Sequence, residues 1–394
     1  MKVLAVNAGS SSLKFKMFEM PEEKVIISGR FERIGDSENS FYSIETEDNK
    51  YKKNAPLKNH SDAVEILIQE LYDNNVIDSL DDLSAVSHRL VHGGDKYPNS
   101  VILDNDSLKA VESFTDLAPL HVPANVMCVR AFMEKCPKAV QVGCFDTAFH
   151  QTIDKERYIY PVPYEWYEKY KVRKYGFHGT SHRYIAETVK KILKKDNFKL
   201  ISCHIGSGGS VCAIKDGKCV DTSMGFTPLA GIMMGTRSGD IDPSIIPYVM
   251  EKEGKNASEI VEDLNKQSGV LGLSELCSDM RDLVTACDEG NPQAIIAKNK
   301  YVRRVVDYIA QYYVLLGGAD IIVFTAGVGE NNIAIRREIC EKLSCLGIKI
   351  DLDLNNVRGE ETKISTKDSS VLVYTIPTNE ELMIARDTLR LMNR

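Results

Sequence analysis

The chain contains two similar segments, and this internal repeat is the feature that most restricts its fold. Residues 3–16 and 200–214 each consist of an apolar stretch, a turn of glycine and serine, and a second apolar stretch. Neither segment has the long helical pattern that a parallel crossover needs, so each is predicted to form a β-hairpin. A hairpin that opens each half of the chain predicts a duplicated domain with a cleft between the two halves.

Helices and strands are predicted to alternate after each hairpin, which is typical of an α/β protein. Apolar residues recur at helical spacing over residues 61–76, with Ser61 as the expected N-cap. Further helices are expected at residues 181–195, 295–316 and 379–392. Strands are expected at residues 140–145, 320–324 and 371–376. The helix over 295–316 should stop at Gly317, because glycine adopts the left-handed conformation that ends many helices.

The composition is that of a folded globular protein, with 43% hydrophobic and 27% charged residues over a length suited to two or three domains. A net charge of −7 argues against a nucleic-acid partner, which would require a basic face. The most apolar region, residues 305–328, is interrupted by Asp307, Gln311 and Asp320, so no membrane span is expected.

The N-terminus and the cysteines predict a cytoplasmic location. The apolar start becomes polar at Asn7, too early for a signal peptide. Ten cysteines are scattered from Cys128 to Cys345 without a CxxC pair, which favours free thiols in a reducing compartment over disulfides or zinc.

Three glycine-rich turns have the character of phosphate-binding sites. Backbone N–H groups in the two hairpin turns could approach phosphate oxygens closely, and Lys14 could add a positive charge. The loop over residues 326–331 follows an apolar strand and precedes a helix, which is a common phosphate-binding geometry. An ordinary tight hairpin explains any one turn alone. A dinucleotide fold is a weaker alternative because Asn332 replaces the third glycine.

Histidines and arginines flanked by glycine are the sharper indication of chemistry. They occur in residues 88–95, 175–182 and 235–240. The four-residue histidine spacing in the first two segments could mimic a metal pair, but no thiolate or carboxylate stands at a matching offset. Arginine, histidine and glycine-rich loops together favour phosphoryl transfer, in which catalysis is mainly positioning and charge neutralisation.

These segments together resemble the acetate kinase family, of the superfamily that includes actin and hexokinase. The matching segments, in family order, are residues 7–14, 88–94, 118–121, 145–150, 175–182, 234–240, 278–282, 324–331 and 376–382. The resemblance implies an α/β fold of duplicated actin-like, or ribonuclease H-like, domains with a central cleft. It places the carboxylate-side domain at residues 1–146 plus 382–394 and the nucleotide-side domain at residues 147–381.

The resemblance also implies roles for individual residues. The catalytic set would be Asp146, His178, Arg237, Arg89 and His121. Arg89 would also orient the substrate carboxylate, and its methyl group would be enclosed by Val91, Leu120, Phe177 and Pro228. The nucleotide would contact Lys14, His204, Ile205, Gly206, Ser207, Gly208, Asp279, Met280, Arg281, Gly327, Val328, Gly329, Glu330 and Asn331. Asn7 and Glu380 would hold Mg²⁺, with Mn²⁺ as an alternative.

The implied reaction is reversible transfer of the γ-phosphoryl group of ATP to acetate, giving acetyl phosphate and ADP, in a cytoplasmic homodimer. A carboxylate is already ionised at neutral pH, so Asp146 is expected to orient Mg²⁺ or Arg89 and not to remove a proton. Two residues depart from the family pattern. Ser207 stands where asparagine is usual, and Val122 replaces asparagine after His121. The alternatives are a propionate or butyrate kinase, an actin-like ATPase and, more remotely, a dinucleotide dehydrogenase.

Overall fold

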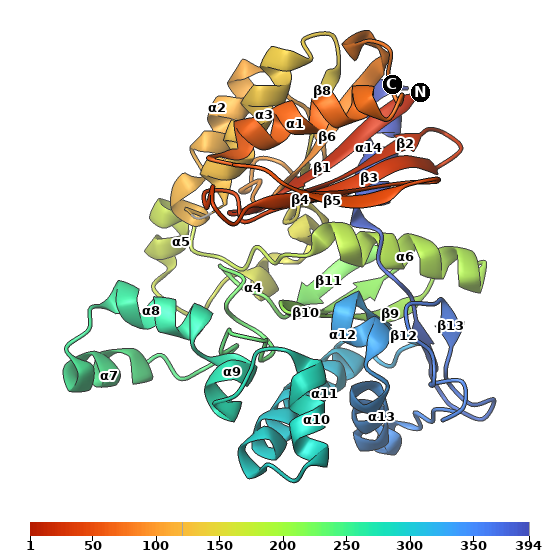
Figure 1. Ribbon diagram of the computed structural model, residues 1–394. Coiled ribbons are helices and arrows are strands. Elements are labelled where there is room, and N and C mark those ends of the chain that lie inside the picture. Colours follow the sequence, from red (N-terminus) through yellow and green to blue (C-terminus); the bar gives the residue numbers. More distant parts are fainter. Residues whose placement is uncertain (120, 394) are drawn as a thin grey trace. The chain divides into compact units, whose positions relative to one another are not determined.

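The computed structural model describes residues 1–119 and 121–393, and this part of the chain divides into two compact units. The first unit comprises Met1–Phe149 and the segment that starts at Asn379, and the second unit comprises His150–Thr378. Each unit has its own mixed β-sheet with helices packed on it (Figure 1).

The first unit is built on a sheet with the strand order β5-β4-β3-β2-β1-β6-β8-β7. Its strands are β1 (Lys2–Ala8), β2 (Ser12–Glu19), β3 (Lys24–Glu32), β4 (Phe41–Thr46), β5 (Lys50–Asn54), β6 (Leu83–Leu90), β7 (Val101–Ile102) and β8 (Val140–Phe145). Its helices are α1 (His60–Asp73), α2 (Asn105–Glu112), α3 (Val122–Lys135) and α14 (Glu380–Met392), with short 3₁₀ turns η1 (Leu80–Asp82) and η2 (Thr115–Leu117).

The second unit is built on a sheet with the order β11-β10-β9-β12-β14-β13. Its strands are β9 (Lys199–Ile205), β10 (Gly209–Lys215), β11 (Lys218–Thr222), β12 (Ile321–Thr325), β13 (Thr362–Lys363) and β14 (Leu372–Thr375). Its helices are α4 (Lys155–Tyr158), α5 (Tyr164–Tyr170), α6 (Gly179–Leu193), α7 (Ile245–Glu253), α8 (Ala257–Lys266), α9 (Gly269–Ser274), α10 (Met280–Asp288), α11 (Pro292–Leu316), α12 (Ala326–Asn331) and α13 (Ile333–Lys342). Two further 3₁₀ turns are η3 (Ala148–Thr152), where the second unit begins, and η4 (Ser344–Leu346).

The two sheets repeat one topology, which confirms the predicted duplication. In the first unit β1 and β2 form the predicted hairpin, β3 extends it, and β6 and β8 add to β1 as parallel neighbours. In the second unit β9, β10 and β11 form the same antiparallel meander, and β12 and β14 follow as parallel neighbours of β9. Each repeat therefore places the ends of parallel strands beside the turn of its own hairpin.

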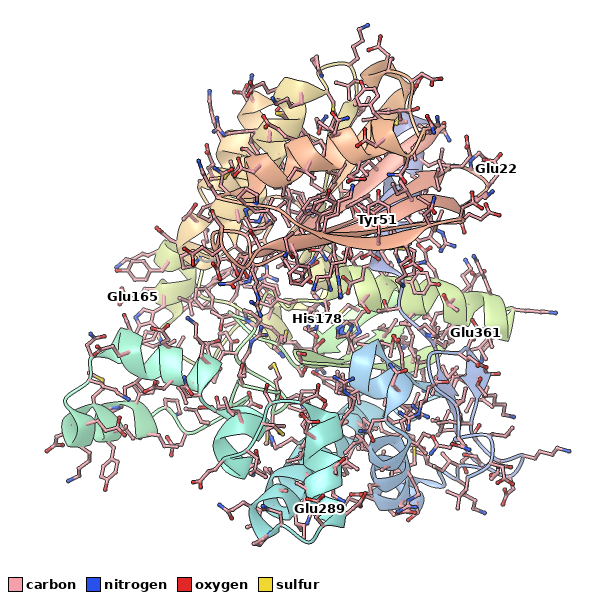
Figure 2. The ribbon with its side chains drawn as sticks, viewed as in Figure 1. Glu22, Tyr51, Glu165, His178, Glu289 and Glu361 are labelled. Atoms are coloured by element: carbon pink, nitrogen blue, oxygen red, sulfur yellow. The ribbon has the colours of Figure 1, made fainter. Side chains whose placement is uncertain are left out.

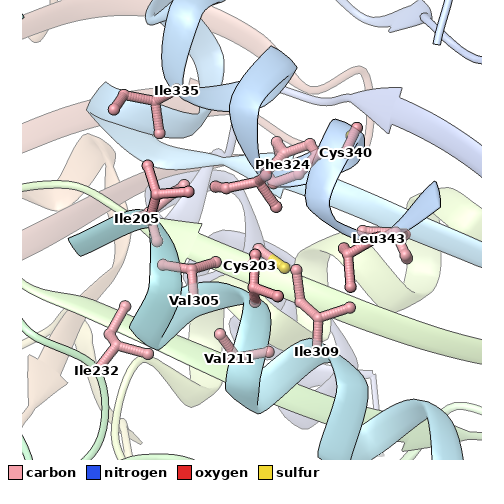
Figure 3. Close-up of a cluster of buried hydrophobic side chains, with 14 of the residues drawn as sticks. Cys203, Ile205, Val211, Ile232, Val305, Ile309, Phe324, Ile335, Cys340 and Leu343 are labelled. Carbon is pink, nitrogen blue, oxygen red and sulfur yellow. The ribbon is translucent and has the colours of Figure 1, made fainter. Parts of the chain in front are cut away.

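Both faces of each sheet are covered where the parallel strands lie. Residues Val3 to Val6 on β1 are all buried, as expected when helices pack on both sides of a strand. Leu4 and Val6 join a core with Val64 of α1 and Cys128 of α3, while α14 also packs on β1. In the second unit the core joins Val305 and Ile309 of α11, Phe324 of β12 and Ile335 of α13 (Figure 3).

The helix ends illustrate how the chain stops and starts each element. Gly317 has φ = 63° and ends α11 as predicted. The start of α1 differs from the prediction, because its N-cap is Asn59 and not Ser61. The Asn59 side chain accepts hydrogen bonds from the N–H groups of Ser61 and Asp62, so the helix begins two residues earlier.

Two predictions from composition can be compared with the described residues. None of the helices in the described ranges combines the length and the apolar character that crossing a membrane would demand. All ten cysteines are free thiols and most are buried.

Candidate functional site

In the first unit, polar side chains gather at the carboxyl ends of the parallel strands β1, β6 and β8. Asn7 on β1 lies opposite Arg89 on β6, and Asp146 directly follows β8. Two nitrogen atoms of the Arg89 guanidinium donate hydrogen bonds to the Asp146 carboxylate. Nε lies 3.0 and 3.1 Å from the two carboxylate oxygens, and Nη2 lies 2.5 Å from Oδ2. Its Nη1 donates to Asn7 Oδ1 at 3.0 Å. This edge of a sheet is where α/β proteins commonly bind ligands.

Glu380 adds a second carboxylate to this cluster from the first turn of α14. Burial raises the pKa of Glu380 to about 7, with Arg89 and Lys14 opposing the shift and Asp146 supporting it. Lys14 is exposed on β2, opposite Asn7. Carboxylates that lie close together repel one another, and a bound cation reduces this repulsion. Mg²⁺ prefers oxygen ligands, which the carboxylates and the amide of Asn7 supply. Asn7 and Glu380 therefore fit the metal predicted from the sequence.

The other candidates in the first unit lie near the same strands. Val91 follows β6, is buried, and donates its N–H to Asn125 Oδ1 at 3.1 Å. His121 is the N-cap residue of α3, and Val122 is buried in the first turn of that helix. Leu120, predicted to contact the substrate, lies outside the described residues.

In the second unit, His178, whose side chain is labelled in Figure 2, directly precedes α6. Its backbone conformation is unusual. Its φ of 58° is in the left-handed region, which is uncommon for a residue with a side chain. Its Nδ1 lies 2.9 Å from Ser210 Oγ, which is also 2.8 Å from His182 Nε2. The ring stacks on His204, with 4.1 Å between ring centroids. The preceding Phe177 is buried.

Arg237 is a partly buried cation held by neutral groups. Its Nη1 lies 3.1 Å from the Pro228 carbonyl and 3.7 Å from Met234 Sδ. Among the described residues of its unit, no carboxylate lies within ion-pair distance of Arg237, and desolvation lowers its pKa. A cation without a counter-ion is well suited to bind an anionic ligand.

The turn of the second hairpin brings these groups together. A Cβ atom placed on Gly208 would lie 3.4 Å from Arg237 Nη1 and 3.6 Å from His178 Nε2. A Cβ atom on Gly206 would lie 3.6 Å from the N atom of Gly327. Three segments that are far apart in the sequence, including the loop at residues 326–331, therefore converge on the turn at residues 206–208.

A cavity of about 790 Å³ opens beside this turn within the second unit. Its lining includes many of the predicted nucleotide-binding residues, namely Gly206, Ser207, Asp279, Met280, Arg281, Gly327, Val328 and Asn331. Asp279 caps α10 and pairs with Arg281, which lowers the pKa of Asp279 to about 2. The volume lies in the usual range for a small-molecule site.

Other predicted nucleotide-binding residues shape this cavity without lining it. Ile205 is fully buried in the core and packs against Gly329. Glu330 Oε1 accepts hydrogen bonds from the N–H groups of Ala326 at 2.7 Å and Thr378 at 3.0 Å. Since Ala326 has φ = 64°, this carboxylate holds a strained turn in place.

Some lining residues were not predicted. Arg337 and Arg358 bring further positive charge to the cavity, and Tyr301 contributes a buried ring. Gly235 and Ser278 belong to segments that the sequence singled out, so their positions could have been inferred. Arg358 lies in a loop that has no distinctive sequence pattern. Its position at the cavity depends on how the chain folds and could not be inferred from the local sequence.

Comparison with known proteins places these observations in a family. The Acetokinase family profile matches residues 2–386. An acetate kinase of Aster yellows witches'-broom phytoplasma is 50% identical over 391 residues, which are 99% of this chain and 95% of that protein. An acetate kinase of Bacillus cytotoxicus is 48% identical over 394 residues, covering 100% of this chain and 99% of the relative.

Solved structures give the same result. The crystal structure of Porphyromonas gingivalis acetate kinase is 43% identical, covers 99% of both chains and has a TM-score of 0.94. A propionate kinase from Francisella tularensis is 40% identical, also covers 99% of both chains and also has a TM-score of 0.94. Sequence and structure agree over the full length. The chain belongs to the acetokinase family.

Proposed function

We propose that this chain transfers the γ-phosphoryl group of ATP to acetate, reversibly, giving acetyl phosphate and ADP. The observation that carries the proposal is the full-length similarity to proteins named acetate kinase, at 48–50% identity. The 40% identity to a propionate kinase makes propionate a second candidate acceptor. The two acids differ by one methylene, so the same machinery serves either reaction.

The proposed roles follow from the charges of the reaction. Acetate is ionised at neutral pH, so the acceptor needs no base, and the main barrier is repulsion between two anions. Arg89 orients the carboxylate, while Arg237 neutralises charge that develops on the transferring phosphoryl group. Asp146 positions Arg89 through the ion pair described above. His178, fixed by Ser210, donates a hydrogen bond to the same phosphoryl oxygens, and His121 supports the acceptor side.

The metal and the nucleotide are assigned to different residues. Asn7 and Glu380 would hold Mg²⁺, with Mn²⁺ as an alternative, and the ion would neutralise the phosphate charges of ATP. Lys14 would contact the phosphates, and the cavity in the second unit would hold the nucleotide, with the backbone N–H groups of the turn at residues 206–208 facing phosphate oxygens. The first unit is thus the proposed carboxylate side and the second the nucleotide side.

The remaining assignments rest on the family and are part of the proposal. We propose a homodimer that acts in the cytoplasm and binds neither nucleic acid nor membrane. The net charge of −7 agrees with the absence of a nucleic-acid partner.

An assay for acyl phosphate tests the reaction directly. Purified protein with Mg²⁺, ATP and acetate is expected to form a product that reacts with hydroxylamine, and omission of acetate should abolish phosphate transfer. Parallel assays with propionate and butyrate rank the acceptors. Release of phosphate from ATP at the same rate without any carboxylate would instead indicate an ATPase and overturn the proposal.

Acceptor length should depend on Val91, one of the residues proposed to enclose the methyl group. Val91→Ala removes two methyl groups from a buried position, so it should improve propionate relative to acetate. One methylene in such a pocket typically changes discrimination by about 1–3 kcal/mol. We expect the ratio of kcat/KM for propionate to that for acetate to rise about tenfold. An unchanged ratio would place the pocket elsewhere, and Ile102→Ala, at an exposed site on β7, is the control.

Donor preference should depend on Ser207, where this chain departs from its family. Ser207 is exposed and lines the cavity, and its backbone carbonyl accepts a hydrogen bond from Gly235 N at 3.1 Å. An asparagine side chain offers both a donor and an acceptor where serine offers one hydroxyl. Ser207→Asn should therefore lower KM for ATP by about two- to tenfold, corresponding to one hydrogen bond. The kcat/KM values for ATP, GTP and pyrophosphate are measured in wild type and in Ser207→Asn. If the value for each donor is the same in the two proteins, the substitution is neutral.

A further inference from the structure

Three side chains that could bind a metal ion, one imidazole and two thiols, lie close together inside the second unit. They lie beside the sheet that also carries the turn at residues 206–208. His150 lies in η3, Cys212 on β10 and Cys219 on β11. All three side chains are buried, and their ligand atoms lie within 4.8 Å of one another. The two cysteines are seven residues apart on one hairpin, whereas His150 is 69 residues from Cys219. No spacing in the sequence therefore marks the cluster, which forms only when η3 packs on the hairpin.

The distances within the cluster are close to those around a metal ion. His150 Nδ1 lies 3.2 Å from Cys219 Sγ, and the two sulfur atoms are 3.5 Å apart. With the usual zinc bond lengths and tetrahedral angles, two sulfur ligands lie about 3.8 Å apart, and a sulfur and a nitrogen ligand lie about 3.6 Å apart. In these two pairs the ligand atoms would need to separate by only a few tenths of an ångström to reach the distances around an ion.

The orientation of His150 is that of a metal ligand. Its Nε2 lies 2.8 Å from the carbonyl oxygen of Phe177, so Nε2 carries the proton and donates it to that oxygen. The lone pair of Nδ1 then points to the cysteines. Histidines that bind metals almost always donate their other ring N–H to a carbonyl or carboxylate in this way, which fixes both tautomer and ring orientation.

The surrounding backbone holds the ligands in place. Thr152 Oγ1 donates to the carbonyl oxygen of Cys219 at 2.7 Å, which fixes η3 to β11. Gly176 has φ = 74°, and a Cβ atom there would lie 2.7 Å from Cδ2 of His150. The segment before Phe177 can therefore lie against the imidazole ring only because residue 176 is glycine.

We propose that His150, Cys212 and Cys219 form a binding site for a thiophilic d¹⁰ metal ion, of which Zn²⁺ is the best match. Two thiolates and a neutral imidazole cancel the charge of a divalent ion, which a site without solvent requires. Binding releases the protons that the two thiols still carry and leaves the imidazole neutral.

This ion is chemically distinct from the Mg²⁺ of the proposed function. Mg²⁺ requires oxygen donors and is assigned to residues of the first unit, whereas sulfur and imidazole donors select zinc or monovalent copper. The inference does not depend on the proposed reaction, because metal content can be measured in a protein of any activity.

Metal content in variants tests the site. The chain is produced in medium with added Zn²⁺, so that the ion can enter during folding, and is then dialysed against a chelator before elemental analysis. We expect about one Zn²⁺ per wild-type chain and at least a tenfold loss in Cys212→Ala, Cys219→Ala and His150→Phe. Cys203→Ala removes a buried thiol outside the cluster and Cys345→Ala an exposed one, and both should retain the ion. Wild type that retains neither zinc nor copper, or equal metal content in all variants, overturns the proposal.

A spectroscopic measurement on the wild type covers the case in which a cluster variant fails to fold. Protein produced with Co²⁺ in place of Zn²⁺ should show a thiolate-to-cobalt charge-transfer band with the intensity of two sulfur ligands. Growth with an added Cu²⁺ salt, which the cell reduces to Cu⁺, distinguishes the metals, since retention of copper at the same three residues would assign the site to that ion. Cobalt or copper bound without a thiolate band would overturn the assignment to these cysteines.

Discussion

Arg237→Ala is expected to lower kcat by about a hundred- to a thousandfold while leaving the fold intact. Arg237 is a partly desolvated cation whose observed partners are the Pro228 carbonyl and a methionine sulfur. Removing it costs the protein no ion pair among the described residues of its unit. The charge is therefore available for the transferring phosphoryl group, and its loss should act on the transition state.

Steady-state kinetics and urea unfolding together check this prediction. We expect KM for ATP to change much less than kcat, and the free energy of unfolding to stay within about 0.5 kcal/mol of wild type. Arg303→Ala is the matched control, because Arg303 is 67% exposed on α11 and pairs with Asp307. Wild-type kcat in Arg237→Ala would remove this residue from the proposed machinery.

Arg89→Ala is expected to abolish activity and also to destabilise the first unit. Arg89 pairs with Asp146, whose side chain is only 2% exposed. Removing one partner of a buried ion pair leaves an uncompensated charge, which typically costs about 3–5 kcal/mol. Arg89→Ala should therefore be less stable than Arg237→Ala, although both variants should lose most of their activity.

The double variant Arg89→Ala with Asp146→Ala separates the two effects. Since it removes both charges, it should recover most of the stability lost in Arg89→Ala but none of the activity. Urea unfolding followed by near-ultraviolet circular dichroism measures the first quantity and the acyl phosphate assay the second. Equal instability of the single and double variants would mean that the cost arises from lost packing and not from the orphaned Asp146 charge.

Local sequence patterns predicted the fold well where one residue decides the geometry. Gly317 ends α11 because it adopts a left-handed conformation, and the turn residues of the two hairpins set their registers. The start of α1 was predicted less well, because Ser61 and Asn59 are both good caps and only the observed hydrogen bonds distinguish them.

The candidate site was predictable to a different degree in each unit. Arg89 and Asp146 stood out because their segments matched a family pattern, and the parallel pairing of β6 and β8 explains why they meet. Arg358 and the cluster of His150, Cys212 and Cys219 could not be predicted, since each depends on contacts between segments distant in the sequence. The role of Glu330 in nucleotide binding stays a prediction, and its carboxylate accepts hydrogen bonds from two backbone N–H groups.

The position of α14 has a consequence for how the chain is made. This helix packs on β1 and β6, yet it follows the whole of the second unit in the chain. A ribosome therefore completes the second unit, which is continuous, while the first still lacks the helix that covers one face of its sheet. Buried residues such as Val3 and Ala5 stay uncovered throughout that interval. The nascent first unit is thus the part that a chaperone would protect from aggregation, and it closes only after the second unit has been synthesised.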